Sequence, residues 1–169
     1  MTDSSRGPLA LVGYMGSGKS TVGRFLSRSL GWDLVDLDRE IRRREDSSIP
    51  RIFEQHGEAY FREVEHAALT DALDEAGRVI ACGGGVVVDP RNRELLCRAA
   101  TVFLHEDVEA LYERTRVKGR PLAGSSFEEF SARYEERLPY YREVAGLRLH
   151  VGNRPARKVA REIERWLNG

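Results

Sequence analysis

Gly13-Tyr14-Met15-Gly16-Ser17-Gly18-Lys19-Ser20 is a glycine-rich segment that matches the pattern G-x-x-x-x-G-K-[ST], and its surroundings decide the fold. A short apolar run, residues 9–13, leads into it and predicts a buried strand. After it, Gly31 closes a segment in which apolar residues recur at helical spacing: Val22, Phe25, Leu26 and Leu30. A glycine-rich loop between a strand and a helix turns backbone N–H groups inward, which is an arrangement that holds phosphate groups.

The chemistry of this loop predicts nucleotide binding. Lys19 can reach the β- and γ-phosphates of ATP as a compact charge, and the Ser20 hydroxyl can ligate Mg²⁺. Only three of the 27 basic residues are lysines, so a lysine at this position is informative; the alternative is a glycine-rich turn with a solvated lysine. The residues expected to bind ATP here are Gly16, Ser17, Gly18, Lys19, Ser20 and Thr21.

Length and composition exclude several classes of protein. A chain of 169 residues with 41% hydrophobic residues can build one folded domain, expected over residues 1–169. Lys+Arg and Asp+Glu both number 27, so no net charge draws the chain to nucleic acid or to a membrane surface. The chain contains no apolar run of about 18 residues, which a helix would need to span a bilayer. The chain has only two cysteines, Cys82 and Cys97, which excludes a disulfide scaffold and a cysteine zinc cluster and fits a reducing cytoplasm. We also expect the protein to be a monomer.

The remaining pattern alternates strands with helices. Strands are expected at residues 33–36, 79–81, 100–104 and 147–151. Helices are expected at residues 58–76, 107–115 and 127–144, and around the apolar stripe Val159, Ile163, Trp166 and Leu167. Strands separated by helices imply parallel pairing in an α/β sandwich, whose ligands bind beyond the carboxyl ends of the strands.

Two carboxylates follow the second expected strand. In extended geometry, Asp36 and Asp38 point to the same face and both reach the crevice. One carboxylate can help to hold Mg²⁺ and its waters, while the other accepts a hydrogen bond from an attacking hydroxyl. The alternative makes Asp38 a simple N-cap for the helix that contains Ile41.

Further candidates lie in loops. Gly83-Gly84-Gly85 directly follows a strand, which suggests that the backbone approaches a ligand; the alternative is a loose turn. Residues 116–126 are polar, basic and glycine-containing, and they predict a mobile lid; the alternative is an ordinary surface loop. Arg62 and Arg137, taken alone, are typical of solvated helix faces, and the four histidines show no metal-ligand spacing.

These segments together resemble those of shikimate kinase across essentially the whole chain. The first is shared by many nucleotide-binding families, whereas the others, in this order, are much more specific. The resemblance rests on Gly13–Thr21, Asp36-Leu37-Asp38, Phe61-Arg62-Glu63-Val64-Glu65, Gly83-Gly84-Gly85, Arg120-Pro121-Leu122 and Arg137-Leu138-Pro139-Tyr140-Tyr141.

The resemblance implies an α/β three-layer sandwich with a five-stranded parallel sheet, the P-loop kinase fold with a mobile lid at about residues 115–126. It also implies a substrate-binding helical segment at about residues 37–65. The implied reaction transfers the ATP γ-phosphoryl group to the 3-hydroxyl of shikimate, on the route to aromatic amino acids.

The same resemblance implies roles for individual residues. Asp38 contacts the reacting hydroxyl and is catalytic together with Lys19 and the lid residue Arg120, which faces the phosphates. Shikimate contacts Asp38, Arg62, Gly83, Gly84, Gly85 and Arg137, with the two arginines clamping its carboxylate. ATP also contacts Arg114, Arg120 and Arg154, and Mg²⁺ is held near Ser20 and Asp36.

Independent chemistry agrees with the implied clamp, because arginine binds a carboxylate through paired N–H groups that fix its orientation. Two other functions stay open from the residues alone. One is a related small-molecule kinase that acts on gluconate or a nucleoside monophosphate. The other is a catalytically silent nucleotide-binding module.

Overall fold

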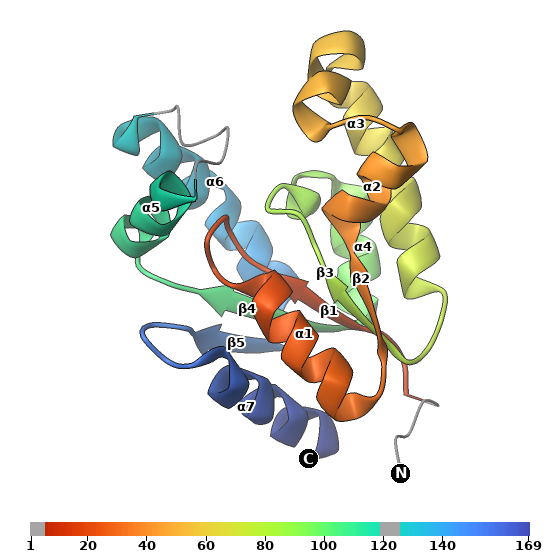
Figure 1. The fold of residues 1–169 in the computed structure, drawn as a ribbon, viewed down its shortest axis with the longest axis vertical. Coiled ribbons are helices and arrows are strands. Elements are labelled where there is room, and N and C mark those ends of the chain that lie inside the picture. The colour runs from red at the N-terminus through yellow and green to blue at the C-terminus, as the bar shows by residue number, and fades with distance from the viewer. Residues whose placement is uncertain (1–5, 119–125) are drawn as a thin grey trace.

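The computed structural model describes residues 6–118 and 126–169, which alternate strands and helices along the chain (Figure 1). A short 3₁₀ helix is labelled η1. The elements in order are β1 (Leu9–Val12), α1 (Lys19–Leu30), β2 (Asp33–Asp36), α2 (Leu37–Glu45), α3 (Ile49–Leu73), β3 (Arg78–Ala81), η1 (Val86–Val88), α4 (Pro90–Arg98), β4 (Ala100–His105), α5 (Val108–Val117), α6 (Phe127–Val144), β5 (Leu147–His150) and α7 (Ala156–Asn168).

The strands form one five-stranded parallel sheet in the order β2-β3-β1-β4-β5. β1 lies at its centre, where Leu9 pairs with Val79 on one side and with Ala100 on the other. All four residues of β1 are buried, as expected for a central parallel strand that is covered on both faces. This arrangement confirms the predicted α/β sandwich and places the strand ends at one edge.

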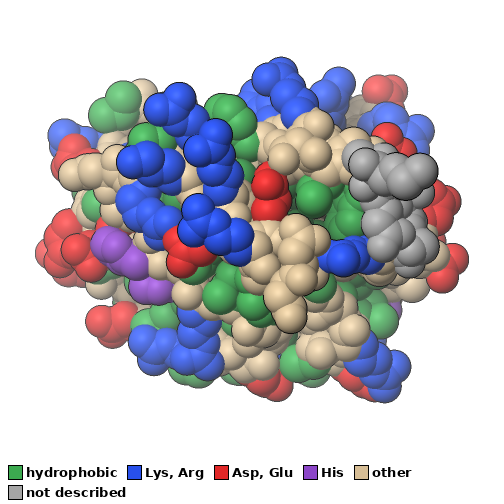
Figure 2. Space-filling view, turned by 90° about the horizontal axis from the view of Figure 1, so that it is seen from below, with side chains coloured by type: hydrophobic (Ala, Val, Ile, Leu, Met, Phe, Trp, Pro, Cys, Tyr) green, Lys and Arg blue, Asp and Glu red, His purple; other side chains and the backbone are tan. Residues whose placement is uncertain are grey.

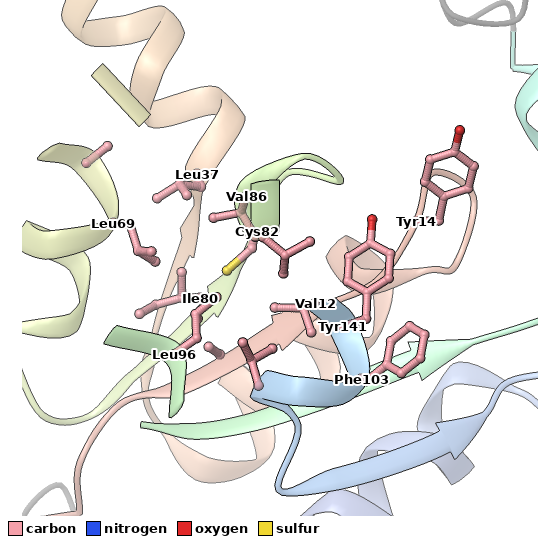
Figure 3. Close-up of a cluster of buried hydrophobic side chains, with 14 of the residues drawn as sticks. Val12, Tyr14, Leu37, Leu69, Ile80, Cys82, Val86, Leu96, Phe103 and Tyr141 are labelled. Carbon is pink, nitrogen blue, oxygen red and sulfur yellow. The ribbon is translucent and has the colours of Figure 1, made fainter. Parts of the chain in front are cut away.

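Helices cover both faces of the sheet and bury a separate core against each face (Figure 1). On one face, α1 and α7 pack side by side, and the core includes Val22, Leu26 and Ile163. On the other face, α3, α4 and α6 enclose a larger core that contains Leu69, Leu96 and Tyr141 (Figure 3). The two cores and the sheet between them make the three layers.

Helix α3 extends the predicted helix toward the N-terminus and bends within its length. The sequence pattern predicts a helix only from residue 58, whereas α3 begins at Ile49, one residue after its N-cap Ser48. Gly57 adopts a non-helical conformation (φ 83°, ψ 174°) that joins two helical halves across a bend. Glycine tolerates this positive φ, which is costly for residues with a Cβ atom. The bend lies within the predicted substrate segment 37–65.

The prediction that Asp36 and Asp38 lie on one face of an extended strand is wrong. β2 ends at Asp36, whose side chain caps α2 by accepting a hydrogen bond from the Arg39 backbone N–H at 3.1 Å. Asp38 is therefore in the first helical turn, and the cap considered for Asp38 belongs to Asp36. A helical turn rotates the side chains by about 100° per residue, so the two carboxylates leave the backbone in different directions.

The surface reflects the balanced composition. Figure 2 shows acidic side chains among basic ones on the face seen from below, with a concentration of basic groups beside histidines at the left. None of the helices formed by residues 6–118 and 126–169 has the length and apolar character needed to cross a bilayer. Of the predicted lid, residues 115–117 belong to α5, and Arg120 lies outside the described residues.

Candidate active site

The loop between β1 and α1 has the backbone geometry of a phosphate cradle. Gly16 and Gly18 adopt positive φ angles of 82° and 87°, and the Ser17 N–H bonds to the Tyr14 carbonyl at 3.2 Å. The Lys19 ammonium donates to the carbonyl oxygens of Gly13 at 2.6 Å and Tyr14 at 3.1 Å. These contacts hold the lysine charge against the loop at the N-terminus of α1, where the helix dipole also favours an anion.

Two oxygen ligands that suit Mg²⁺ lie side by side next to this loop. The Ser20 hydroxyl, in the first turn of α1, donates to Asp36 Oδ2 at 3.3 Å. Mg²⁺ prefers hard oxygen donors and commonly takes only one or two of them from the protein. A hydroxyl and a carboxylate at the edge of a phosphate cradle therefore fit this ion.

The glycine triplet after β3 brings a carboxylate and a guanidinium to the same short segment. A Cβ atom at Gly83 would lie 2.7 Å from Asp38 Oδ1, and one at Gly85 would lie 2.7 Å from an Arg62 nitrogen. Between them, a Cβ atom at Gly84 would lie 3.7 Å from the Met15 N atom of the phosphate loop. Asp38, Arg62 and the phosphate loop thus surround one stretch of backbone, and the lack of side chains there makes this approach possible.

Arg62 is held by α3 and by the glycine triplet rather than by solvent. Its NH1 donates to Glu65 Oε1 at 2.7 Å and to the Gly85 carbonyl at 3.0 Å. Its side chain is 14% exposed, which excludes the solvated helix face expected from its local sequence. Its buried Nε has no hydrogen-bond partner. A buried donor without a partner is costly, so this nitrogen is available to an acceptor that enters the site.

Glu65 places a buried carboxyl group beside the Arg62 guanidinium. Its side chain is 1% exposed, and burial raises the pKa of its carboxyl to about 7, although Arg62 and Arg137 oppose that shift. Asp38 adds to the rise by like-charge repulsion. The sequence analysis assigned no role to Glu65. Its spacing of three residues from Arg62 on a helix is the signal that could have identified it.

Helix α6 supplies the other side of the site. The Arg137 guanidinium lies over the Tyr14 ring, 5.8 Å from the ring centroid. The buried Tyr141 hydroxyl donates to the Gly84 carbonyl, which ties α6 to the glycine triplet. Burial raises the pKa of Tyr141, so the hydroxyl keeps its proton at neutral pH. Tyr141 is a second residue that the sequence analysis missed.

Cys82 lies directly before the triplet, among apolar side chains (Figure 3). Burial raises the pKa of its thiol to about 12, with Lys19 acting in the opposite direction. Glu65, Asp38 and Asp36 add to the rise, which shows that these charged groups act on one buried point. The thiol is therefore an inert packing group.

The predicted nucleotide residues divide into two groups. Arg114 joins the phosphate loop, since its guanidinium donates to the Gly16 carbonyl at 3.3 Å and to the Gly152 carbonyl at 2.9 Å. Arg154 instead donates to the His150 carbonyl at 3.2 Å and forms an ion pair with Glu162 on α7. Thr21 is exposed in the first turn of α1.

Comparison with known proteins identifies the family. The family model described as shikimate kinase matches residues 15–168. The shikimate kinase of Xanthomonas euvesicatoria pv. vesicatoria is 43% identical over 162 residues, covering 93% of this chain and 90% of that protein. A bifunctional shikimate kinase/3-dehydroquinate synthase of Thermotoga maritima is 47% identical over 133 residues; these are 79% of this chain but only 27% of that longer protein.

A solved structure agrees with the sequence relatives. The shikimate kinase from Acinetobacter baumannii, in complex with shikimate, superposes with a TM-score of 0.92 at 37% identity, covering 98% of this chain and 94% of that one. Sequence and fold therefore match the same family of ATP-dependent kinases over nearly the full length of both chains. The chain belongs to the shikimate kinase family.

Proposed function

We propose that this chain transfers the γ-phosphoryl group of ATP to the 3-hydroxyl of shikimate, giving shikimate 3-phosphate and ADP on the chorismate route to aromatic amino acids. The observation that carries the proposal is the convergence of Asp38, Arg62 and the phosphate loop on the Gly83–Gly85 backbone. One anionic acceptor could then meet a carboxylate, a guanidinium and a phosphate cradle at the same time. Family membership supports the choice of acceptor.

ATP binding is assigned to the phosphate loop and to α5. The backbone of Gly16, Ser17 and Gly18 would surround the phosphates, with Ser20 and Thr21 at the start of α1. Lys19 would exchange its contacts with loop carbonyls for the β- and γ-phosphates, where its charge opposes the negative charge that develops in the transition state. Further out, Arg114 and Arg154 are the proposed contacts to the adenine edge, and Arg120 the proposed lid residue at the phosphates.

Mg²⁺ is assigned to Ser20 and Asp36, whose oxygens are neighbours. When bound, the ion would neutralise charge on the β- and γ-phosphate oxygens. Asp36 already accepts a hydrogen bond from the Arg39 N–H, which fixes its carboxylate at the start of α2. This cap orients the second oxygen toward Ser20.

Shikimate is assigned to the space between residues 37–65, the glycine triplet and α6. Arg62 and Arg137 would clamp its carboxylate, and both guanidinium groups act on Glu65, which indicates that they face one region. Paired N–H donors orient a small carboxylate, and orientation supplies much of the catalysis in phosphoryl transfer. Gly83, Gly84 and Gly85 would contact the ring through backbone atoms. All assigned groups come from one chain, and we propose that it acts as a monomer.

Asp38 is the proposed acceptor of the hydroxyl proton. The 3-hydroxyl oxygen would attack the γ-phosphorus while the bond from that phosphorus to the β–γ bridging oxygen breaks, and the hydroxyl proton would pass to Asp38. Placing Asp38 in the first turn of α2 supports this role, because the helix holds the carboxylate against Gly83.

The test is an assay of ADP release with a panel of acceptors: shikimate, gluconate and nucleoside monophosphates. Turnover is expected with shikimate alone, and Asp38→Asn should lower kcat by roughly 10²–10⁴-fold. Turnover of gluconate or a nucleotide without turnover of shikimate would favour a related small-molecule kinase. ATP binding with no ADP release from any acceptor would favour a silent binding module. A loss in Asp38→Asn confined to KM would limit Asp38 to binding.

A further inference from the structure

Arg114 links the two loops that flank the proposed nucleotide site. It reaches the Gly16 carbonyl of the phosphate loop and the Gly152 carbonyl between β5 and α7. Helix α5 itself packs on the phosphate loop, because a Cβ atom at Gly16 would lie 3.0 Å from the Leu111 carbonyl oxygen and 3.1 Å from Thr115 Oγ1. The position of this one guanidinium therefore affects both loops at once.

The group that holds Arg114 is Glu106, in the turn between β4 and α5. Its side chain is only 4% exposed, and Oε2 accepts from Arg114 NH2 at 3.1 Å. Oε1 accepts from the Asp107 backbone N–H at 2.8 Å and lies 3.0 Å from His150 Nε2 at the end of β5. Burial by itself raises the pKa of Glu106, but Asp107, His150 and Arg114 outweigh it and hold that pKa below its ordinary value.

We propose that Glu106 is a positioning residue for the nucleotide: it fixes Arg114 between the phosphate loop and the β5–α7 turn. The proposal deepens the proposed function and rests on it. Glu106 itself need not touch ATP or ADP. Its carboxylate gathers groups from β5 and α5 as well as from its own turn, so that both loops are aligned before the nucleotide enters, and less ordering is needed on binding.

A metal site is the other interpretation of this cluster. Glu106, Asp107 and His150 place possible ligand atoms within 4.8 Å of one another. Both oxygens of Glu106 are already occupied by Arg114, His150 and the Asp107 N–H. An ion would have to displace the Arg114 guanidinium or compete with its charge, so the observed contacts favour positioning over metal binding.

The test is calorimetric titration of ADP with Mg²⁺, and separately of shikimate, into the wild-type protein, Glu106→Gln, Arg114→Met and the double variant. Glutamine has one acceptor oxygen and turns an N–H₂ group toward one of the present donors, so Glu106→Gln should weaken ADP binding roughly 5- to 30-fold. Shikimate affinity should stay within about twofold. If Glu106 acts through Arg114, the double variant should bind ADP no more than about twofold more weakly than Arg114→Met alone.

Other outcomes of this titration would contradict the positioning role of Glu106. Unchanged ADP affinity in Glu106→Gln, or losses that simply add in the double variant, would overturn the positioning role. A parallel loss of shikimate affinity would reduce Glu106 to a general structural residue. Failure of the wild-type protein itself to bind ADP would instead reject the proposed function, and this inference with it.

Two further variants control for folding. Asp89→Asn alters another nearly buried carboxylate, which pairs with Arg91 and caps α4, and it should leave ADP affinity unchanged. His150→Ala removes a half-exposed partner of Glu106 and should fold even if Glu106→Gln does not. It should weaken ADP binding by roughly two- to fourfold, less than the loss of the carboxylate. If Glu106→Gln does not fold and His150→Ala leaves ADP affinity unchanged, the proposal is overturned.

Discussion

The two halves of the candidate site are built in different ways. The phosphate side consists of neighbouring residues, 13–21, whose backbone forms the cradle and whose single charged side chain is Lys19. The acceptor side is assembled from α2, α3, the glycine triplet and α6, and it depends on charged side chains that meet only in three dimensions. The local loop depends on the backbone conformation of its glycines and on one charge, whereas the assembled site depends on each buried partner.

Removing the one charge of the phosphate side should have the largest effect. Lys19→Met should lower kcat by roughly 10³-fold or more while the fold is kept, because the lost charge stabilises the transferring phosphoryl group. Measurements of ADP release and of thermal unfolding check both parts. Lys158→Met, in the exposed part of α7, serves as the matched control and should retain activity. Near-normal turnover of Lys19→Met would break the assignment of the cradle.

On the acceptor side, the buried carboxyl group of Glu65 should make the stability of the fold depend on pH. Because burial raises the pKa of Glu65 from its ordinary value of 4.5 to about 7 in the folded state, the folded protein holds more protons than the unfolded chain between these pH values. The free energy of unfolding should therefore fall as pH rises through this window, by up to about 3 kcal/mol from this group.

Urea unfolding at several pH values between 4.5 and 8 measures this contribution. Glu65→Gln should lack the decline, while Glu63→Gln, an exposed position on the same helix, should keep the wild-type slope. Parallel pH profiles for the wild-type protein and Glu65→Gln would show that the carboxylate is ionised without penalty.

The clamp itself should show an effect on one substrate only. Arg62→Ala should weaken shikimate binding by about 1.5–3 kcal/mol, as expected for a lost charge-assisted contact, and should leave ADP binding nearly unchanged. Arg78→Ala is the matched control, since Arg78 is also mostly buried and paired, with Glu75, at the start of β3. If shikimate affinity is unchanged in Arg62→Ala, the role of Arg62 is limited to its contacts with Glu65 and Gly85.

The smallest expected effect concerns the reactivity of the Cys82 thiol, on which charged groups of both the phosphate side and the acceptor side act. Iodoacetamide at pH 8 should modify the folded protein once, at the exposed Cys97, because burial protects Cys82 and raises its pKa to about 12. Mass spectrometry of the intact protein and of its peptides counts the adducts. Unfolding in urea should make both cysteines reactive. Rapid modification of Cys82 in the folded state would mean that the space behind the glycine triplet opens to solvent.

Local patterns predicted much of the fold. The strand at residues 33–36 and the helix at residues 127–144 have the predicted bounds, since both patterns depend on near neighbours along the chain. Helix α4 was not predicted, because its sequence is mostly polar and only Asn92 and Leu96 are buried. The extended geometry expected for Asp38 failed for a different reason, because the Asp36 cap that starts α2 at Leu37 depends on a single hydrogen bond.

The sequence by itself determined the phosphate loop, the alternation of strands and helices and the family, because each depends on residue types at fixed spacing. Tertiary structure alone decided that Glu65 is buried beside Arg62, that Tyr141 reaches Gly84 and that Glu106 joins Arg114 to His150. The partners of Tyr141 and of Glu106 lie on other elements, mostly far away along the chain. Burial changes the energy of the interaction in each of the three groups. The free energy of a buried charge is set by what surrounds it in space, and no local pattern encodes that environment.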